Sequence, residues 1–275
     1  MPLTSNVWGS GAIGMSKLDF DAFILDLDGC IYSGDSLIPG SERAVSSLRA
    51  NGKKILFLTN NSTNTSQGFS EKLKGLGIHV PPQSILTSAV ATAIYMRRLQ
   101  RGKVFVVGES GLKNALAAEG FEVVDEGGAS KAKYVVSGLD RTLTYRKTAA
   151  ACSAIRGGAK YIATNEDPVF PSEGGLLPGA GSIACMIATA TGRRPLVIGK
   201  PSKRMVEMGL EMLGTHRERT AMVGDTLDLD VKAAKRAGLF SILVLTGVSR
   251  RADVERSRVK PDLILESVSN LSDLA

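Results

Sequence analysis

AFILDLDG, residues 22–29, joins four apolar residues to two aspartates and a glycine. Four consecutive apolar residues without helical spacing predict a short strand buried on both faces, as in the interior of a parallel sheet. Asp26 and Asp28 stand where this strand ends, and alternation along an extended chain is expected to point both side chains to one side. Carboxylates at such an edge are costly unless a cation offsets their charge, so a metal site is one hypothesis. A helix-capping aspartate beside a solvated one is the alternative.

Length and composition bound the class of protein. The chain has 275 residues, of which 43% are hydrophobic, enough for one large domain or two small ones with full cores. No apolar run reaches the roughly 20 residues of a membrane helix, and the N-terminus lacks the charged and apolar segments of a secretion signal. Cys30, Cys152 and Cys185 lack CxxC spacing, so neither a disulfide framework nor a zinc site is expected. We therefore expect a soluble cytoplasmic enzyme that does not associate with membranes.

The formal net charge of +7 raises the question of a nucleic-acid partner. The charge distribution argues against one, because basic residues are spread along the expected helices. The densest group, within residues 250–258, is interrupted by Asp253 and Glu255. With one Trp and 5% aromatic residues, the chain also offers few rings on which bases could stack. A mixed, solvated surface is the preferred interpretation.

Hydrophobic periodicity divides the chain into alternating helices and strands. Residues 1–17, rich in Gly and Ser, are expected to form a flexible leader. Residues 18–81 and 193–275 predict one α/β layer, and residues 82–192 predict a second layer inserted into it. Strands are expected in the first layer at 22–25, 53–58, 195–198, 220–223, 241–245 and 262–265, and in the second at 104–107, 134–136 and 161–163. The fold class is therefore α/β, a doubly wound parallel sheet (Rossmann-like core) with an α/β insertion that faces the substrate.

Polar side chains also follow two other expected strands. Thr59 and Asn60 begin a run of hydroxyls and amides, which suits either a bound anion or an ordinary helix N-cap. Lys200 follows the strand expected at 195–198, where a lone lysine is more often a surface residue. Taken alone, neither group decides between a site and an ordinary surface.

Two more acids lie near the end of the strand expected at 220–223. Asp225 repeats the placement of Asp26, whereas Asp230 fits a site acid and a favourable first-turn acid of a helix equally well. Ligands of open parallel sheets bind beyond the carboxyl ends of the strands, where the strand order switches. Because all four polar groups stand just beyond such ends, we expect them to meet at one edge of the sheet.

A long segment with three prolines, residues 165–181, closes the insertion. An irregular stretch of this length is more often a binding loop than a connector, and a rigid surface turn is the alternative. Its candidate specificity residues are Asn165, Glu166, Asp167 and Phe170. They make the segment the candidate for substrate selection.

The motifs together resemble a known family. DLDG at 26–29, TNNS at 59–62, GKPS at 199–202 and GDTLDLD at 224–230 stand in the order typical of the haloacid dehalogenase superfamily of phosphatases. The resemblance covers residues 20–270. Each motif is weak alone, but the four in this order are highly specific.

The insertion looks like the α/β cap of one branch of that superfamily. This branch contains the nitrophenyl-phosphatase-like, phosphoglycolate and pyridoxal phosphate phosphatases, and the insertion ends in TNEDPVFPSEGGLLPGAGS. Cys30 departs from the Thr that usually follows DxDG, with little expected effect because that side chain need not reach the phosphorus. Phe170 stands where the pyridoxal phosphatases resemble each other in having His, which argues against that substrate.

The resemblance implies Mg²⁺-dependent hydrolysis of a small phosphorylated metabolite. Asp26 would be the nucleophile that forms an aspartyl-phosphate, and Asp28 would protonate the leaving alcohol and then activate water. The metal would be held by Asp26, the main-chain carbonyl of Asp28 and Asp225, with Asp230 orienting the metal shell.

The resemblance also assigns the remaining groups. Lys200 would neutralise both phosphate and nucleophile, while Thr59 and the Asn60 amide would hold phosphoryl oxygens. A homodimer is compatible with it. Two rivals are a phosphoacceptor switch domain, which stays phosphorylated, and a phosphomutase, which returns the phosphoryl group to substrate. Asp28 and the large cap favour turnover over the switch, and phosphate release would separate a hydrolase from a mutase.

Overall fold

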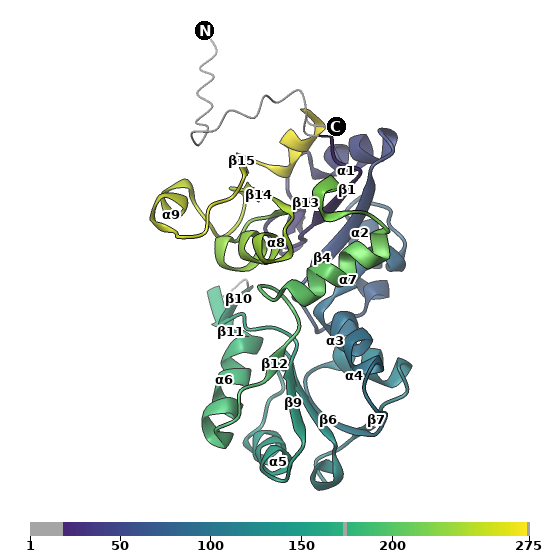
Figure 1. Ribbon diagram of the computed structural model, residues 1–275, viewed down its shortest axis with the longest axis vertical. Helices are drawn as coiled ribbons and strands as arrows, with labels where there is room; N and C mark the ends of the chain where they lie inside the picture. Colours follow the sequence, from purple (N-terminus) through teal and green to yellow (C-terminus); the bar gives the residue numbers. More distant parts are fainter. Residues whose placement is uncertain (1–18, 173–174, 274–275) are drawn as a thin grey trace.

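The larger parallel sheet is centred on β1 (Ala22–Leu25), the apolar run that precedes Asp26 (Figure 1). The computed structural model describes residues 19–172 and 175–273, within which this sheet has the strand order β15-β14-β13-β1-β4-β5. Its other strands are β4 (Lys54–Thr59), β5 (Ile85–Thr87), β13 (Thr220–Gly224), β14 (Phe240–Val244) and β15 (Leu263–Leu265). The neighbouring strands are parallel, and the order reverses at β1. The leader expected at residues 1–17 lies outside the described residues.

Helices cover both faces of this sheet. Successive residues of β1 face opposite ways, so Ile24 belongs to one apolar cluster and Phe23 to another. The cluster of Ile24 includes residues of α3 (Ser88–Arg97), α7 (Lys203–Leu213) and α8 (Lys232–Ala237), and that of Phe23 includes residues of α1 (Ser41–Ala50) and α2 (Ser66–Gly75). β1 is therefore buried along its whole length, as its unbroken apolar run predicts.

The inserted layer has its own parallel sheet, in the lower half of Figure 1. The order β12-β9-β8-β6-β7 joins β6 (Lys103–Val107), β7 (Glu122–Val124), β8 (Tyr134–Ser137), β9 (Lys160–Ala163) and β12 (Leu196–Val197). Its helices are α4 (Ser110–Ala118), α5 (Tyr145–Arg156) and α6 (Ala180–Thr191). The apolar cluster of Ile24 continues to Val106 of β6, so the two layers share a core on that side.

The structure shifts both expected junctions between the layers. β5 pairs with β4 in the larger sheet, although the sequence places everything from 82 to 192 in the insertion. β12 pairs with β9 in the second sheet, whereas the sequence predicts a strand of the first layer at 195–198. Strands of three and two residues carry no periodicity, and an apolar run does not reveal which strand it will pair with.

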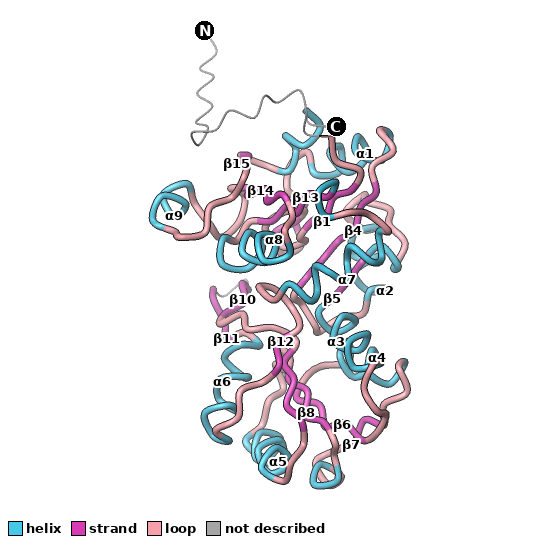
Figure 2. Tube along the Cα trace, in the orientation of Figure 1, coloured by secondary structure: helices cyan, strands magenta, loops and turns pink. Residues whose placement is uncertain are grey.

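The segment 165–181 is also more regular than expected. It contains an antiparallel hairpin of β10 (Val169–Ser172) and β11 (Gly175–Pro178), in which Phe170 lies opposite Leu177 (Figure 2). The prolines of this segment favour a loop in sequence terms, but an edge strand tolerates proline because one side of it needs no ladder hydrogen bonds.

The described chain also contains smaller elements. A hairpin of β2 (Tyr32–Ser33) and β3 (Ser36–Leu37) follows β1, and α9 (Arg251–Arg256) precedes β15. None of the helices in the described ranges has both the length and the apolar character that a membrane span requires.

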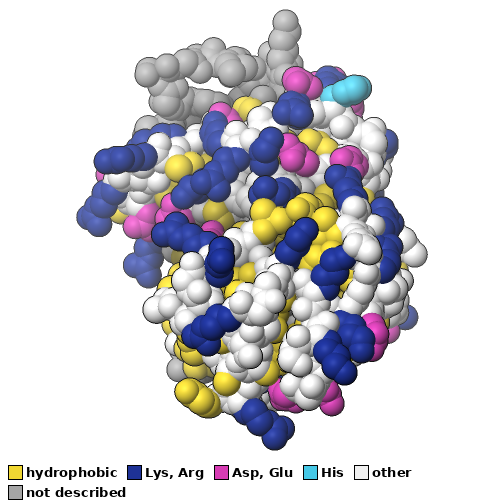
Figure 3. Space-filling model, turned by 60° about the horizontal axis from the view of Figure 1, so that its bottom comes forward, with side chains coloured by type: hydrophobic (Ala, Val, Ile, Leu, Met, Phe, Trp, Pro, Cys, Tyr) yellow, Lys and Arg dark blue, Asp and Glu magenta, His cyan; other side chains and the backbone are white. Residues whose placement is uncertain are grey.

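Figure 3 shows Lys and Arg side chains spread over both layers, with uncharged residues between them. On the face in view, the net charge of +7 is not gathered into one patch.

Candidate active site

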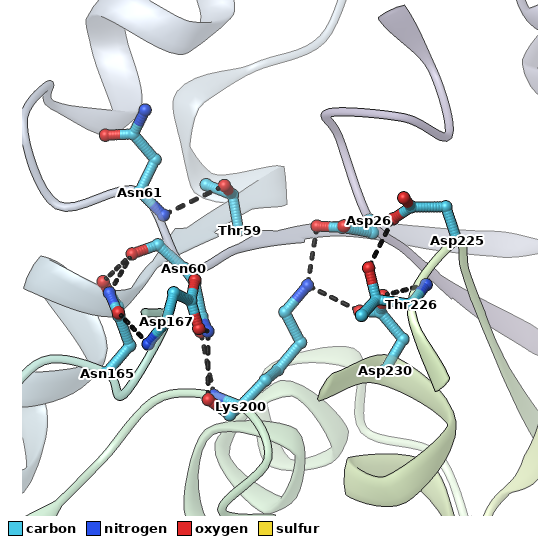
Figure 4. A network of polar contacts seen from close by, with 11 residues as sticks. Asp26, Thr59, Asn60, Asn61, Asn165, Asp167, Lys200, Asp225, Thr226 and Asp230 are labelled. Atoms are coloured by element: carbon cyan, nitrogen blue, oxygen red, sulfur yellow. Dashed lines mark hydrogen bonds and ion pairs between the residues drawn. The ribbon is translucent and has the colours of Figure 1, made fainter. Parts of the chain in front are cut away.

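Three buried carboxylates meet at the edge where β1 and β13 end (Figure 4). Asp26 follows β1 and Asp225 follows β13, and these strands are parallel neighbours, so both acids leave the sheet side by side. Asp230 comes from a one-turn π-helix, Leu227–Val231. One oxygen from each acid lies within 4.8 Å of the other two. The structure therefore brings these three predicted site residues together.

Lys200 lies among these acids. Its ammonium nitrogen is 2.7 Å from Asp26 Oδ1 and 2.6 Å from Asp230 Oδ1, and its side chain is 2% exposed. Burial disfavours the charged lysine, but the Asp230 and Asp26 carboxylates outweigh burial and raise the pKa of Lys200 above its usual value. Lys200 is thus a fixed positive charge inside the site, not a surface lysine.

One lysine does not neutralise three acids. Burial raises the pKa of Asp26 well above its usual value, and the Lys200 charge opposes that rise. Burial and the charge of Asp230 raise the pKa of Asp225 to about 6. The group is therefore short of positive charge. Three convergent carboxylate oxygens are ligands that suit a hard divalent cation, and the donor set fits Mg²⁺.

Glycines allow the main chain to close around Asp225. Gly29 has a φ of 76°, and a Cβ there would lie 2.6 Å from Asp225 Oδ2. A Cβ on Gly247 would overlap the same oxygen, so a larger residue at either position would displace the carboxylate. The Val248 N–H donates to Asp225 Oδ2 at 2.7 Å. Sequence reasoning missed this loop, whose signal is that it follows β14 at the same edge of the sheet.

Asp28 is not part of the cluster of three carboxylates formed by Asp26, Asp225 and Asp230, and lies beside it. Its side chain is exposed while that of Asp26 is buried, because the chain turns directly after the strand and alternation ends there. Partial burial raises the pKa of Asp28, and the Lys72 charge and the N–H groups of Gly29 and Gly34 oppose the rise. The carboxyl of Asp28 is thus more accessible to solvent than that of Asp26.

Asn60 bridges Lys200 and the insertion. Its Oδ1 accepts from the Lys200 N–H at 2.8 Å, and its Nδ2 donates to the Lys200 carbonyl at 3.0 Å and to Asp167 Oδ1 at 2.8 Å. Thr59 Oγ1 accepts from the Asn61 N–H at 3.1 Å. The Asn60 side chain is therefore structural. Phosphate binding by Thr59 and the Asn60 amide stays a prediction.

Two of the four candidate specificity residues turn toward this bridge. Asn165 Nδ2 donates to the Asn60 carbonyl at 2.7 Å, and Asn165 Oδ1 accepts from the Asp167 N–H at 3.0 Å. Burial raises the pKa of Asp167 to about 6, and the Lys200 charge and the hydrogen bond from Asn60 oppose that rise. Glu166 is exposed, and Phe170 lies on β10. The segment thus has an anchored part beside the core and a projecting hairpin.

Comparison with known proteins identifies the family. A haloacid dehalogenase-like hydrolase model matches residues 23–122, and a second model of HAD-like hydrolases matches residues 197–271. A dihydroxyacetone phosphatase of Corynebacterium glutamicum (strain R) is 39% identical over 253 residues, which are 92% of this chain and 90% of the relative. The chain belongs to the haloacid dehalogenase-like hydrolases.

Solved structures of this family agree with the fold described above. The 4-nitrophenylphosphatase from Thermotoga maritima is 41% identical with a TM-score of 0.88, covering 93% of this chain and 97% of that one. A glycerol phosphate phosphatase from Mycobacterium tuberculosis, in complex with magnesium, is 34% identical with a TM-score of 0.86, covering 92% and 76%. The expected doubly wound core with an α/β cap is confirmed, and this haloacid dehalogenase-like hydrolase is a phosphatase.

Proposed function

We propose that this phosphatase hydrolyses a small-molecule phosphate monoester with Mg²⁺ as cofactor and Asp26 as nucleophile. The main support is the buried group of Asp26, Asp225 and Asp230 with Lys200 at the end of β1. A carboxylate cannot approach a phosphate dianion unless positive charge offsets the repulsion. Lys200 supplies part of that charge beside the nucleophile.

The cluster of three carboxylates is the proposed metal site. Asp26, Asp225 and the main-chain carbonyl of Asp28 would hold Mg²⁺, and Asp230 would orient the metal shell. When bound, the cation would supply the positive charge that the buried acids lack and polarise the phosphoryl group. The magnesium complex of the related glycerol phosphate phosphatase supports this choice of ion.

In the proposed first step, an Asp26 oxygen attacks phosphorus and the bond to the leaving oxygen breaks. The Asp28 carboxyl gives its proton to that oxygen, so the alcohol leaves neutral. The raised pKa of Asp28, caused by partial burial, favours the protonated form that this step needs. Thr59 and the Asn60 amide would hold the phosphoryl oxygens as charge develops on them.

In the second step, the aspartyl-phosphate on Asp26 is hydrolysed. The Asp28 carboxylate takes a proton from water, the water oxygen attacks phosphorus, and the bond between Asp26 and phosphorus breaks. Inorganic phosphate leaves, Asp26 is a carboxylate again, and Asp28 is again protonated. Each group has returned to its starting state, so the cycle balances.

The substrate class is proposed from the relatives. Dihydroxyacetone and glycerol, for which two relatives are named, are both three-carbon alcohols. We therefore propose a small polyol or sugar phosphate as substrate. Phe170 on the projecting hairpin would face the organic part of the ester, and not the phosphoryl group.

Phosphate release from a panel of esters tests the proposal. Glycerol phosphate, dihydroxyacetone phosphate, pyridoxal phosphate and 4-nitrophenyl phosphate are compared with Mg²⁺ and with a chelator. Metal-dependent release that is fastest with the three-carbon esters is expected. A long-lived phosphoprotein without turnover would instead favour the switch, and transfer to a second alcohol without net release would favour the mutase.

A further inference from the structure

The β2–β3 hairpin forms one unit with Asp28. Asp28 makes an isolated bridge to Tyr32, and the Gly29 N–H donates to the Tyr32 carbonyl at 2.7 Å. Tyr32 is buried, but the chain is exposed where the hairpin turns at residues 34–35. A two-stranded ribbon of this size is not stable on its own, so the position of its tip depends on contacts from other elements.

Lys72 of α2 supplies such contacts. Its ammonium nitrogen donates to the Gly34 carbonyl at 2.7 Å and lies 3.1 Å from Asp35 Oδ1. The same nitrogen lies 4.3 Å from the centroid of the Tyr32 ring, a cation–π distance. Because α2 is anchored by its own buried apolar residues, the lysine connects a fixed helix to the hairpin tip.

The backbone of Gly34 extends this connection to Asp28. Its carbonyl accepts from Lys72, and its N–H hydrogen-bonds to the Asp28 carboxyl. The Asp35 side chain is 91% exposed, so its ion pair with Lys72 contributes little. The hydrogen bond to the Gly34 carbonyl is therefore the contact that carries the restraint toward Asp28.

We propose that Lys72 is a positioning residue for Asp28, which it serves by holding the hairpin tip so that the Asp28 carboxyl meets the leaving oxygen of the substrate. The contacts of Lys72 described above are with the hairpin, so its effect on the reaction passes through Asp28. This inference rests on the proposed function, because the acid role of Asp28 belongs to that proposal. It predicts a defect in proton transfer to the leaving group.

Two esters with different leaving groups test this role. 4-Nitrophenyl phosphate releases a weakly basic phenolate that needs little protonation, whereas glycerol phosphate releases a basic alkoxide that requires a proton. Lys72→Met is expected to lower kcat with glycerol phosphate by about tenfold or more, and kcat with 4-nitrophenyl phosphate by less than about threefold. Lys72→Arg keeps the charge and the donors, and is expected to restore turnover of glycerol phosphate.

Two matched variants control for charge and for the exposed ion pair. Lys74→Met removes a positive charge from the same last turn of α2, at an exposed residue. Asp35→Asn removes only the exposed partner of Lys72. Both are expected to keep kcat with either ester within about twofold of the original protein.

The outcomes separate this inference from the proposed function. Equal losses with both esters, or no loss with either, would overturn the role of Lys72 while leaving the phosphatase mechanism in place. If the unaltered protein hydrolysed neither ester, the proposed function would fall and this inference with it. Thermal unfolding checks each variant. If Lys72→Met does not fold, Lys72→Leu, which also lacks a donor, replaces it with the same expected split.

Discussion

The cluster of three carboxylates and the β10–β11 hairpin differ in burial: the first consists of buried charged residues, and the second exposes apolar ones. Asp225 and Lys200 are 3% and 2% exposed and have charged or hydrogen-bonding partners, whereas Leu176 and Leu177 of the hairpin are 71% and 43% exposed. The partners of buried charges hold them in place, so the side chains of the first region have fixed positions in the folded protein. Exposed apolar side chains contribute favourable free energy only when another molecule or segment covers them. Under the proposed function, the first region performs the chemistry and the second selects the substrate.

A change to the proposed nucleophile should have the largest effect of the changes that test this comparison. Asp26→Asn keeps the shape of the side chain but removes the charge that attacks phosphorus, so turnover should fall on the order of 10⁴-fold or more. The measurement is phosphate release at saturating 4-nitrophenyl phosphate with Mg²⁺. Near-normal release from the variant would refute the assignment of Asp26.

Lys200→Met breaks the charge balance of the same region. The variant leaves Asp26 and Asp230 without their ammonium partner, so the free energy of unfolding should fall by about 3–5 kcal/mol and kcat by about 10²-fold. Urea unfolding and phosphate release measure the two effects. Lys203→Met is the matched control, because Lys203 makes an exposed pair with Glu207 and should change stability by no more than about 0.5 kcal/mol.

Much of the carboxylate region follows from the sequence. Parallel strands bring their carboxyl ends to one edge, so Asp26 and Asp225 could be placed together once β1 and β13 were recognised. Lys200 could be placed there only through its motif, because the strand before it, β12, belongs to the other sheet. The direction of the Asn60 carboxamide could not be predicted, since that depends on partners far away in the chain.

The cap region follows less well from the sequence. β5 and β12 are too short to show periodicity, and their pairing is decided by tertiary contacts. The β10–β11 hairpin exposes apolar residues and contains prolines, so neither alternation nor composition identifies it as a pair of strands. Such exceptions to sequence patterns are expected at functional sites, and the proposed contact of the hairpin with substrate would account for this one.

Without metal, the cluster of three carboxylates should make the stability of the protein depend on pH. Asp225 has a folded-state pKa of about 6, above its ordinary value of 3.8. Between about pH 4 and pH 6 the unfolded chain therefore releases its proton before the folded one. The free energy of unfolding should fall as pH rises through this window, by on the order of 1–3 kcal/mol.

Magnesium sharpens this test. If the three acids hold Mg²⁺ as proposed, the ion should restore stability above pH 6, because it would bind the ionised acids of the folded protein. Asp167, whose pKa is also about 6, lies outside the cluster of three carboxylates but is affected by the charges of Lys200 and Asp230, so Mg²⁺ should change its contribution less than that of Asp225. Thermal unfolding from pH 4 to pH 8, with chelator and with Mg²⁺, measures both. Asp225→Asn is the control and should make the fall in stability shallower, with Asp26 and Asp167 left to contribute the remainder. Metal-free stability that rises through the window would contradict the charge balance described here.

Leu176→Ser tests the other side of the comparison and should have the smallest effect on stability. Since Leu176 is 71% exposed, the free energy of unfolding should change by less than about 0.5 kcal/mol. If the hairpin covers the organic part of the ester, KM for 4-nitrophenyl phosphate should rise about three- to tenfold while kcat stays the same, since contact with the ring is equal in ground and transition states. Leu176→Met, which keeps an apolar side chain, should leave KM unchanged. An unaltered KM in the serine variant would instead assign the exposed leucines to another contact and remove substrate selection from the hairpin.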